Sequence, residues 1–241
     1  MFKAGELTAY KKEELKDFPW NTEYAGYYLS DIAAIISLLP KDPCDVLDLG
    51  CGPGITSHFY ALRGHRVVGI DVNTECLALA PGKHLNTELR PAFVRHDYEE
   101  RFCKELFDAA VFHDSLHHAM YPEAALMTAF EALKPGGICI VSEPGVGHSW
   151  SQFAQKFARD NNVTERSTPP YKVWRLGKRI GFELVAVYPH FGTLHKTMFR
   201  TEQVPGLLRR IAHSLRFSVL SLLLGKWLHG VTVLRKPLNQ L

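Results

Sequence analysis

Short apolar runs alternate with helical patterns along most of the chain. Most of these runs end at a glycine, a proline or an acidic residue, which is typical of strands buried on both faces of a sheet. The segments between them repeat apolar residues three and four positions apart, the spacing of an amphipathic helix. We expect strands at 45–50, 66–71, 92–97, 107–114, 138–143, 182–189 and 230–236. We expect helices at 24–39, 55–64, 74–80, 122–133 and, as a long segment, near 206–228.

This order of elements predicts the architecture. Strands that alternate with helices at this pitch form βαβ units around a parallel sheet with helices on both faces. The alternation breaks after Pro144, where 145–180 is expected to be loop and helix, and the last two strands should close one sheet edge as a hairpin-like pair. The fold class is therefore α/β: a Rossmann-like, doubly wound sheet of seven strands, mostly parallel with an antiparallel last strand.

Composition narrows the class of protein without naming a function. The 241 residues are 46% apolar and 22% charged, which favours a folded α/β domain over a disordered chain. The net charge is +3 and the basic residues form no long run, so no nucleic-acid partner is expected.

The cysteines and the apolar stretches bear on location. Five cysteines without a CxxC pair indicate reduced thiols in a reducing compartment rather than disulfides or a zinc site. Residues 1–18 contain acids and no apolar signal core, and the apolar stretch 217–225 is far shorter than the ~18 residues of a membrane span. We therefore expect a cytoplasmic protein.

The loop after the first expected strand carries the first chemical signal. Gly50, Gly52 and Gly54 follow a strand that contains Asp48. A dinucleotide-binding loop would need its third glycine at position 55, which is Ile55, and no Gly-Lys-Ser/Thr sequence follows for a P-loop. A carboxylate on the strand suits a cationic ligand group such as a sulfonium, and it repels phosphate.

Five segments in order resemble the motifs of class I S-adenosylmethionine-dependent methyltransferases of the UbiE/UbiG-like, small-molecule type. They are VLDLGCGPG, VVGIDVN, VRHDYEE, FDAAVFHDSLHH and LKPGGICIVSEP. The resemblance implies S-adenosyl-L-methionine as cofactor and S-adenosyl-L-homocysteine as product. It also implies the cofactor-binding residues, which are Asp48, Gly50, Cys51, Gly52, Gly54, Asp71, Val72, Asp97, Tyr98 and His113. In this set Asp71 would hold the ribose hydroxyls and Asp97 would lie beside the adenine.

The same resemblance suggests how the chain is divided. Residues 1–241 would form a single methyltransferase domain, in which 41–144 is the core that binds S-adenosylmethionine. We expect 1–40 to be a helical lid, 145–180 to be an insertion that covers the substrate, and 181–241 to supply the closing strands and helix.

Candidates for the chemical step lie in the loops after the fourth and fifth strands. Methyl transfer from a sulfonium is an in-line displacement, in which the enzyme positions the acceptor and excludes water. An oxygen or nitrogen acceptor also needs a base, and His117 and His118 are the candidates, unless they orient the loop and contact the cofactor. Glu143 either orients the acceptor or caps the segment that follows it.

Tyr24, His148 and Trp150 are candidates for contact with the acceptor. Tyr24 lies with Tyr27 and Tyr28 on the expected lid, where an aromatic stripe is equally compatible with packing. His148 and Trp150 open the 145–180 insertion. Side chains that could ligate a metal also occur at His113, Asp114, His117 and His118. They match no recognised metal pattern, so no metal is expected.

The predicted function is methyl transfer to a small-molecule acceptor, a metabolite or sugar, at oxygen, nitrogen or carbon. One alternative is a methyltransferase of a lipid or lipid-linked saccharide that docks on the membrane through 207–228, and another is a non-catalytic scaffold that binds S-adenosylmethionine. In 207–228 an apolar helical face comprises Leu208, Ile211, Leu215, Val219 and Leu222. That face is compatible with a membrane surface and with packing on the sheet.

Overall fold

The computed structural model describes most of the chain. The described residues are 13, 15–22, 25–83, 88–161, 163–189, 206–220, 228 and 230–238. Tyr24 therefore lies outside the described residues, as does the second part of the expected 206–228 helix, apart from residue 228.

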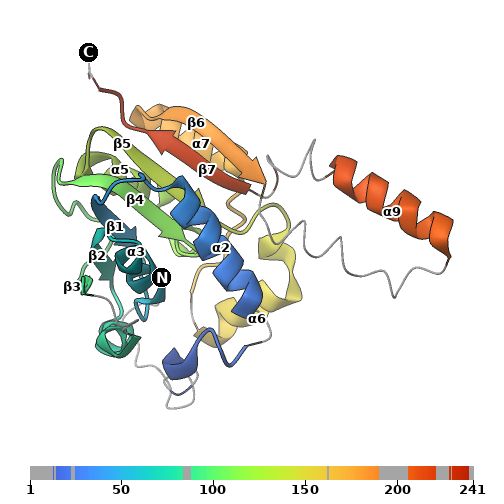
Figure 1. Cartoon of the computed structure of the whole chain (residues 1–241), viewed down its shortest axis with the longest axis horizontal. Coiled ribbons are helices and arrows are strands. Elements are labelled where there is room, and N and C mark those ends of the chain that lie inside the picture. The colour runs from blue at the N-terminus through green and yellow to red at the C-terminus, as the bar shows by residue number, and fades with distance from the viewer. Residues whose placement is uncertain are drawn as a thin grey trace.

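The described residues form one seven-stranded sheet, as the sequence predicts (Figure 1). The strands are β1 (Asp45–Leu49), β2 (Arg66–Asp71), β3 (Ala92–Arg95), β4 (Phe107–His113), β5 (Leu133–Ser142), β6 (Glu183–Pro189) and β7 (Gly230–Arg235). Their order is β3-β2-β1-β4-β5-β7-β6. β7 runs antiparallel to both β5 and β6, whereas the pairs among β1 to β5 are parallel. The predicted closing pair is thus confirmed, with β6 at the edge.

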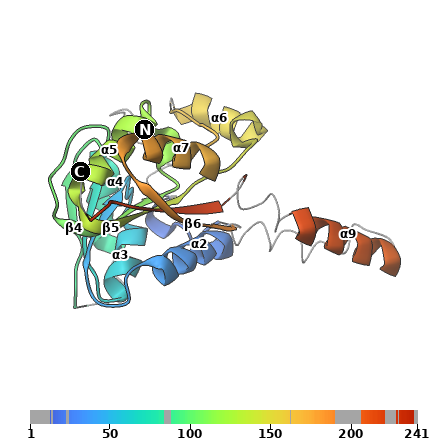
Figure 2. The same cartoon turned by 90° about the horizontal axis from the view of Figure 1, so that it is seen from above.

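The described helices cover both faces of this sheet. The helices of eight or more residues are α2 (Ala25–Leu38), α3 (Ile55–Leu62), α5 (Pro122–Ala132), α6 (Gln152–Asn161), α7 (Pro170–Ile180) and α9 (Leu207–Leu220), and α4 (Thr74–Leu79) is shorter. Figure 2 shows α2 and α3 on one side of the sheet and α5 and α7 on the other. Each expected helix up to α5 is present, with ends that differ by one or two residues.

The alternation of side chains along the strands creates two apolar cores. On β1, Val46 faces the core that contains Ile32 of α2 and Tyr60 of α3. The next residue, Leu47, faces the core that contains Leu126 of α5. Because successive strand residues point to opposite faces, a strand that is apolar at every position must be buried on both. The doubly buried first strand inferred from sequence is therefore confirmed, whereas the edge strands β3 and β6 are partly exposed.

Helix α9 differs from the other helices in its surroundings. Figures 1 and 2 both show it standing away from the sheet and its covering helices. The exposed fractions of its apolar side chains Leu208, Ile211, Leu215 and Val219 are 82%, 48%, 61% and 51%. Packing of this face on the sheet, one of the two expectations, is therefore not what the described residues show. Within the described part of the chain no helix has the length and apolar character to cross a membrane.

Candidate active site

The loop between β1 and α3 turns on three glycines with left-handed backbone conformations. The φ angles of Gly50, Gly52 and Gly54 are +78°, +52° and +79°. A Cβ atom at Gly50 would lie 2.6 Å from Ser115 Cβ, and one at Gly54 would lie 2.6 Å from Phe93 Cζ. A Cβ atom at Gly52 would meet no atom of the described residues within 4 Å. Gly52 therefore leaves open space in which a ligand can approach the backbone closely.

Asp71, the last residue of β2, is hydrogen-bonded to this loop. Its carboxylate accepts hydrogen bonds from the backbone N–H of Gly52 at 2.9 Å and of Asn73 at 2.8 Å. Burial raises the pKa of Asp71, and the two N–H donors act in the opposite direction. Each carboxylate oxygen has two lone pairs, so capacity remains for the two hydroxyls of a ribose. The open space at Gly52 and the half-buried carboxylate beside it fit the expected cofactor.

Asp48 is buried and faces the first turn of α3. Its Oδ2 atom accepts hydrogen bonds from the hydroxyls of Thr56 and Ser57, both at 2.6 Å. Burial raises the pKa of Asp48, although both hydroxyl donors favour the charged form. These bonds fix the start of α3 against β1 and so shape the glycine loop. Contact of Asp48 with the cofactor stays a prediction.

Asp97 and Tyr98 follow β3, as expected from sequence. The Asp97 carboxylate is half-buried and accepts a hydrogen bond from the backbone N–H of Glu99 at 2.8 Å. The Tyr98 hydroxyl donates to the carbonyl oxygen of Ser115 at 2.8 Å, and its ring lies edge-on to Phe112 in the core. Tyr98 thus joins the loops after β3 and β4, while Asp97 is accessible to a ligand.

Three further residues of the expected cofactor set surround the same loops. His113, the last residue of β4, is buried with its ring centroid 4.8 Å from that of Tyr28 on α2. Neither ring nitrogen of His113 has a hydrogen-bond partner among the described residues. Cys51 is also buried, and burial holds the pKa of its thiol well above the ordinary value, while Val72 is half-buried. A bound ligand could supply the hydrogen-bond partner that the buried His113 ring lacks in the described part of the chain.

Glu143, directly after β5, holds the loop that follows β4. Its Oε1 atom accepts from the backbone N–H of Ser115 at 2.9 Å and of Leu116 at 2.7 Å. Its Oε2 atom lies 3.2 Å from the backbone N and 2.6 Å from Nδ1 of His117. Glu143 therefore caps residues 115–117 rather than the segment after it, and it orients the His117 ring.

Residues 163–168, here called the strap, are hydrogen-bonded to the loop that follows β4. The Thr164 hydroxyl donates to the carbonyl oxygen of His118 at 2.6 Å, and its own carbonyl oxygen lies 2.8 Å from His118 Nδ1. The backbone N–H of Arg166 donates to the carbonyl oxygen of His117 at 3.1 Å. These bonds place Glu165, between them in sequence, against the histidine rings.

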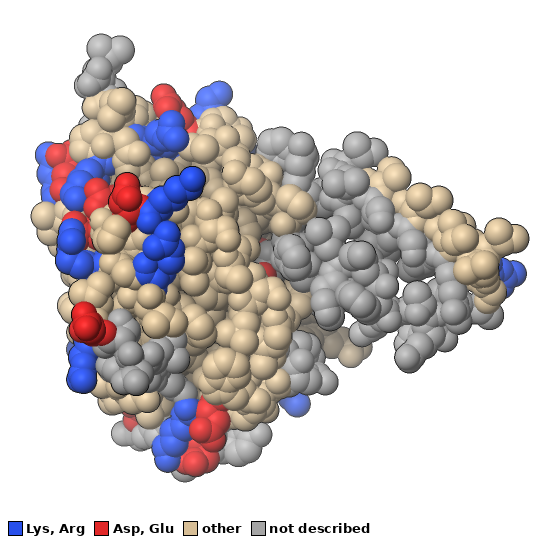
Figure 3. Space-filling view, in the orientation of Figure 1, with Lys and Arg blue, Asp and Glu red and all other residues tan. Residues whose placement is uncertain are grey.

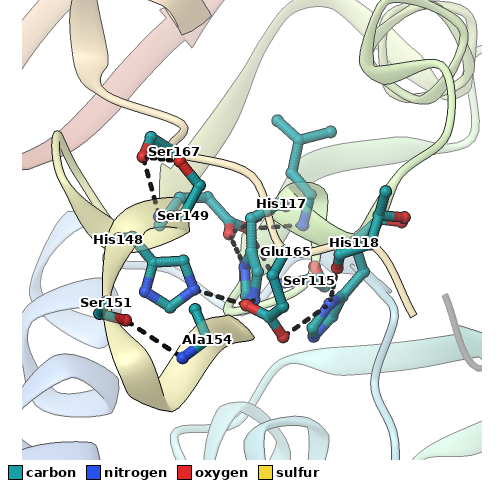
Figure 4. Close-up of polar contacts among 12 residues, drawn as sticks. Ser115, His117, His118, His148, Ser149, Ser151, Ala154, Glu165 and Ser167 are labelled. Carbon is teal, nitrogen blue, oxygen red and sulfur yellow. Dashed lines mark hydrogen bonds and ion pairs between the residues drawn. The ribbon is translucent and has the colours of Figure 1, made fainter. Parts of the chain in front are cut away.

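Glu165 lies at the centre of a group of imidazoles, as Figure 4 shows. Its Oε2 atom is 2.5 Å from His148 Nε2 and 3.6 Å from His117 Nε2. Its Oε1 atom is 3.4 Å from His118 Nδ1. We call His117, His118, His148 and Glu165 the His–Glu cluster. Sequence reasoning selected the three histidines and missed Glu165, since nothing in its own segment distinguishes it from other surface acids.

The burial of the cluster shifts its titrations. Burial lowers the pKa of His117 to about 4 and that of His118 to about 3, so both rings are neutral at physiological pH. Burial raises the pKa of Glu143 to about 7, against the opposing effect of the three N–H donors. Burial also acts to raise the pKa of Glu165, but the hydrogen bond from His148 and the neighbouring imidazoles lower it overall. The neutral rings of His117 and His118 thus lie beside an ionised Glu165 carboxylate.

The remaining aromatic and acidic residues near the site differ in how exposed they are. Trp150 follows His148 in the same short helical turn, but its side chain is 77% exposed, outside the cluster. Tyr27 is half-buried on α2, and burial raises its pKa to about 12, with added effects of Asp31 and Asp114. Asp114 has a φ of +49°, and its pKa is raised by desolvation.

The fold and the site are typical of one class of protein: a doubly wound sheet with a glycine loop after β1 and an acid at the end of β2 is the arrangement of α/β domains that bind nucleosides. Residues 47–141 match the family model described as "Methyltransferase domain". Ubiquinone biosynthesis O-methyltransferases are similar over the same part: that of Psychrobacter cryohalolentis is 36% identical over 101 residues, and that of Pseudomonas fluorescens is 38% identical over 96. These matches cover 40% and 38% of this chain and 39% and 40% of the relatives.

Solved structures extend the likeness to almost the whole chain, as fold alone. Phosphoethanolamine N-methyltransferase 2 of Haemonchus contortus, in complex with S-adenosyl-L-methionine, has a TM-score of 0.65 at 18% identity, over 97% of this chain and 58% of that one. A putative methyltransferase of Haloferax volcanii, in complex with the activator Trm112, has a TM-score of 0.66 at 17% identity. This match covers 94% of this chain and 98% of that one. The class I S-adenosylmethionine-dependent methyltransferase resemblance is thus confirmed, and 47–141 is the segment that carries it. The chain spans about two fifths of the length of these curated relatives.

Proposed function

We propose that this protein transfers the methyl group of S-adenosylmethionine to a hydroxyl oxygen of a small-molecule acceptor in the cytoplasm. The proposal rests on the position of the His–Glu cluster, which is held by the loops after β4 and β5. The glycine loop and Asp71 follow β1 and β2 of the same sheet. In doubly wound sheets ligands bind at the carboxyl ends of the strands, so both groups face one binding region.

Each part of this region has a task in the reaction. The bound cofactor supplies an electrophilic methyl group on a sulfonium, and transfer discharges the sulfur. Gly52 admits the cofactor, and Asp71 accepts hydrogen bonds from its ribose. An acceptor hydroxyl must lose its proton as the new bond forms, and Nε2 of His117 can accept that proton, because the carboxylates of Glu143 and Glu165 on either side of the ring stabilise the resulting imidazolium. Oxygen as the acceptor atom also agrees with the O-methyltransferase names of the curated relatives.

The first experiment uses carbon-13 methyl-labelled S-adenosylmethionine, the purified protein and a cell extract, with Asp71→Ala as the blank. We expect labelled product in the aqueous phase, with the methyl resonance in the range of O-methyl groups. A resonance typical of N-methyl or C-methyl groups would contradict oxygen as the acceptor. Label no higher than in the blank would instead favour a non-catalytic protein that binds S-adenosylmethionine.

A second candidate function, methyl transfer to a lipid-linked acceptor, is favoured by helix α9. Its apolar side chains are exposed, and Arg209 lies on the same helix. Figure 1 shows this helix standing away from the sheet. An amphipathic helix with basic residues binds anionic lipid surfaces through apolar insertion and charge together. Elsewhere on the face in Figure 3, basic and acidic side chains intermingle.

Liposome flotation separates the two candidates. If α9 docks on membranes, the protein should float with anionic vesicles at low salt, and Leu208→Glu with Leu215→Glu should abolish flotation. High salt should weaken the charge contribution. Equal flotation of the wild type and the double variant, or none by either, would leave the soluble acceptor as the proposal. Label recovered in the organic phase of the transfer assay would favour the lipid-linked acceptor.

A further inference from the structure

The His–Glu cluster contains three ligand atoms suited to one metal ion. We propose that His117, His148 and Glu165 bind a divalent ion of the Zn²⁺ class, with Glu143 as the support for His117. Each residue contributes one nitrogen or carboxylate oxygen, and the three atoms lie within 4.8 Å of one another. In Figure 4 the three side chains converge from the loop after β4, the turn before α6 and the strap.

The distances are close to those of a tetrahedral site. Zinc binds imidazole nitrogen and carboxylate oxygen at about 2.0–2.2 Å, which places two tetrahedral ligand atoms roughly 3.4 Å apart. His117 Nε2 and Glu165 Oε2 are 3.6 Å apart. His148 Nε2 and Glu165 Oε2 are hydrogen-bonded at 2.5 Å, so this pair needs to open by roughly 1 Å when an ion replaces the proton between them.

The support around His117 resembles that of metal-ligating histidines. In metal sites the second ring nitrogen commonly donates to a carboxylate, which fixes the tautomer and the ring orientation. Here Nδ1 of His117 lies 2.6 Å from Glu143 Oε2, so Nε2 is the nitrogen with a free lone pair toward Glu165. Backbone N–H groups of the loop hold Glu143 in this position.

The charge of the site also favours a cation. Two buried carboxylates, Glu143 and Glu165, lie within one cluster. In the part of the chain that the structure describes, their ion-pair partners are histidines rather than lysine or arginine. A divalent ion bound by Glu165 would compensate carboxylate charge inside the buried cluster.

A second combination, Asp114, His117 and Glu143, also brings three ligand atoms within reach of one another. It is the weaker site, because both Glu143 oxygens already accept hydrogen bonds from the loop backbone or from His117. Metal binding there would break the bonds that shape the loop. His148 and Glu165, by contrast, lose only the bond they make to each other.

Three protein ligands leave a fourth position open, as in catalytic rather than structural zinc sites. An acceptor hydroxyl bound there would lose its proton to solvent water more readily, because the ion would stabilise the oxyanion. This role rests on the proposed function, whereas binding of the ion itself does not. In this arrangement His117 is a ligand, and the ion rather than a free base activates the hydroxyl.

The test is metal binding by the full chain without acceptor. Protein stripped with a chelator is titrated with Zn²⁺ by calorimetry and with Co²⁺ by visible absorption. We expect binding at a single site, with visible bands typical of four-coordinate Co²⁺. The variants His148→Ala and Glu165→Gln should each weaken binding at least tenfold, and Glu143→Gln by roughly 10–100-fold. The control is His96→Ala, which removes a histidine that lies after β3 beside Glu100, outside the cluster.

The outcomes separate the site from the function. S-adenosylmethionine affinity and circular dichroism show whether each variant is folded. No binding by the wild type, or equal binding by folded His148→Ala and Glu165→Gln, overturns the metal site. Methyl transfer that persists in the stripped protein but falls in His148→Ala would instead make the cluster a metal-free proton acceptor, which leaves the proposed function intact. Metal binding without any methyl transfer would overturn the proposed function alone.

Discussion

Gly52 and Gly54 share a left-handed backbone but differ in what surrounds them. A methyl group at Gly54 would collide with Phe93 in the packed interior, whereas one at Gly52 would enter open space. We expect Gly54→Ala to lower the free energy of unfolding by about 2–4 kcal/mol, from strain and overpacking together. Gly52→Ala should cost about 1–2 kcal/mol from backbone strain alone, yet lower S-adenosylmethionine affinity at least tenfold by filling the ligand's space.

Urea denaturation and calorimetric titration of the two variants check this contrast. Each variant serves as the control for the other, because both place the same side chain on the same backbone conformation. If Gly52→Ala binds S-adenosylmethionine as tightly as the wild type, the cofactor does not approach the loop at this position.

Asp71 is the residue on which cofactor affinity should depend most directly. Its carboxylate accepts two backbone N–H bonds and retains lone pairs for ligand hydroxyls. In Asp71→Asn one oxygen becomes an N–H₂ donor, which faces the backbone N–H of either Gly52 or Asn73 and loses that hydrogen bond. We expect S-adenosylmethionine affinity to fall by about 1.5–3 kcal/mol, the range for hydrogen bonds to a charged group.

Equilibrium dialysis with labelled cofactor measures this loss. Asp97→Asn is the matched control, because Asp97 is a half-buried aspartate at the end of the neighbouring strand. A smaller loss of affinity in Asp97→Asn than in Asp71→Asn would identify Asp71 as the carboxylate that binds the ribose. A larger loss would assign that role to Asp97.

At the scale of elements, the strap links residues 145–180 to the loop after β4 by hydrogen bonds. The Thr164 hydroxyl bridges the strap to His118, whereas the Thr128 hydroxyl, on α5, makes the same kind of bond to the carbonyl oxygens of Glu100 and Ala124. Replacement by valine at either position should lower the free energy of unfolding by about 1–2 kcal/mol. Only Thr164→Val should also lower kcat, because Glu165 follows directly in the strap.

Steady-state kinetics of the two valine variants test this coupling, once the acceptor is identified by the transfer assay. Equal kcat values in Thr164→Val and Thr128→Val would mean that the strap does not position the cluster. A fall in both would point to a general loss of folded protein, which the unfolding measurements would reveal.

At the scale of the whole molecule, the buried cluster should make stability depend on pH. His117 and His118 have lowered pKa values, so their contribution to stability is complete above pH 6.5 and is lost on acidification toward about pH 4 and 3. Glu143 has a raised pKa, so its contribution is complete below about pH 4.5 and is lost as the pH rises through about 7. Between roughly pH 4.5 and 6.5, unfolding takes up two protons on the histidines and releases one proton from Glu143.

The net uptake on unfolding is therefore one proton, and these groups should lower stability by about 1.4 kcal/mol for each unit of acidification in that window. Urea denaturation at several pH values, in the presence of a chelator, measures the slope. His118→Asn removes one titrating ring. The slope of stability against pH in this variant should therefore be smaller than in the wild type by about 1.4 kcal/mol for each pH unit. An unchanged slope in this variant would show that His118 titrates normally in the folded protein.

The period of apolar residues and the positions of glycine and acid determined most of the fold and the cofactor region. The strand and helix order, the glycine turn and Asp71 follow from local rules, because each depends on neighbours close in sequence. Trp150 shows the limit of that reasoning, since the sequence pattern does not predict that this side chain is exposed, and its contact with an acceptor stays a prediction. The position of α9 away from the sheet was likewise one of two outcomes that its amphipathic pattern allowed.

The tertiary structure alone decided how the His–Glu cluster is assembled. Glu165 reaches His117 and His148 because the strap pairs with a loop from a distant part of the chain, and no periodicity encodes that pairing. Glu143 likewise gains its role from backbone donors on the neighbouring strand's loop rather than from its own segment. Local sequence patterns specify which face of an element is buried, whereas long-range contacts decide which polar side chains meet, and here those contacts create the cluster.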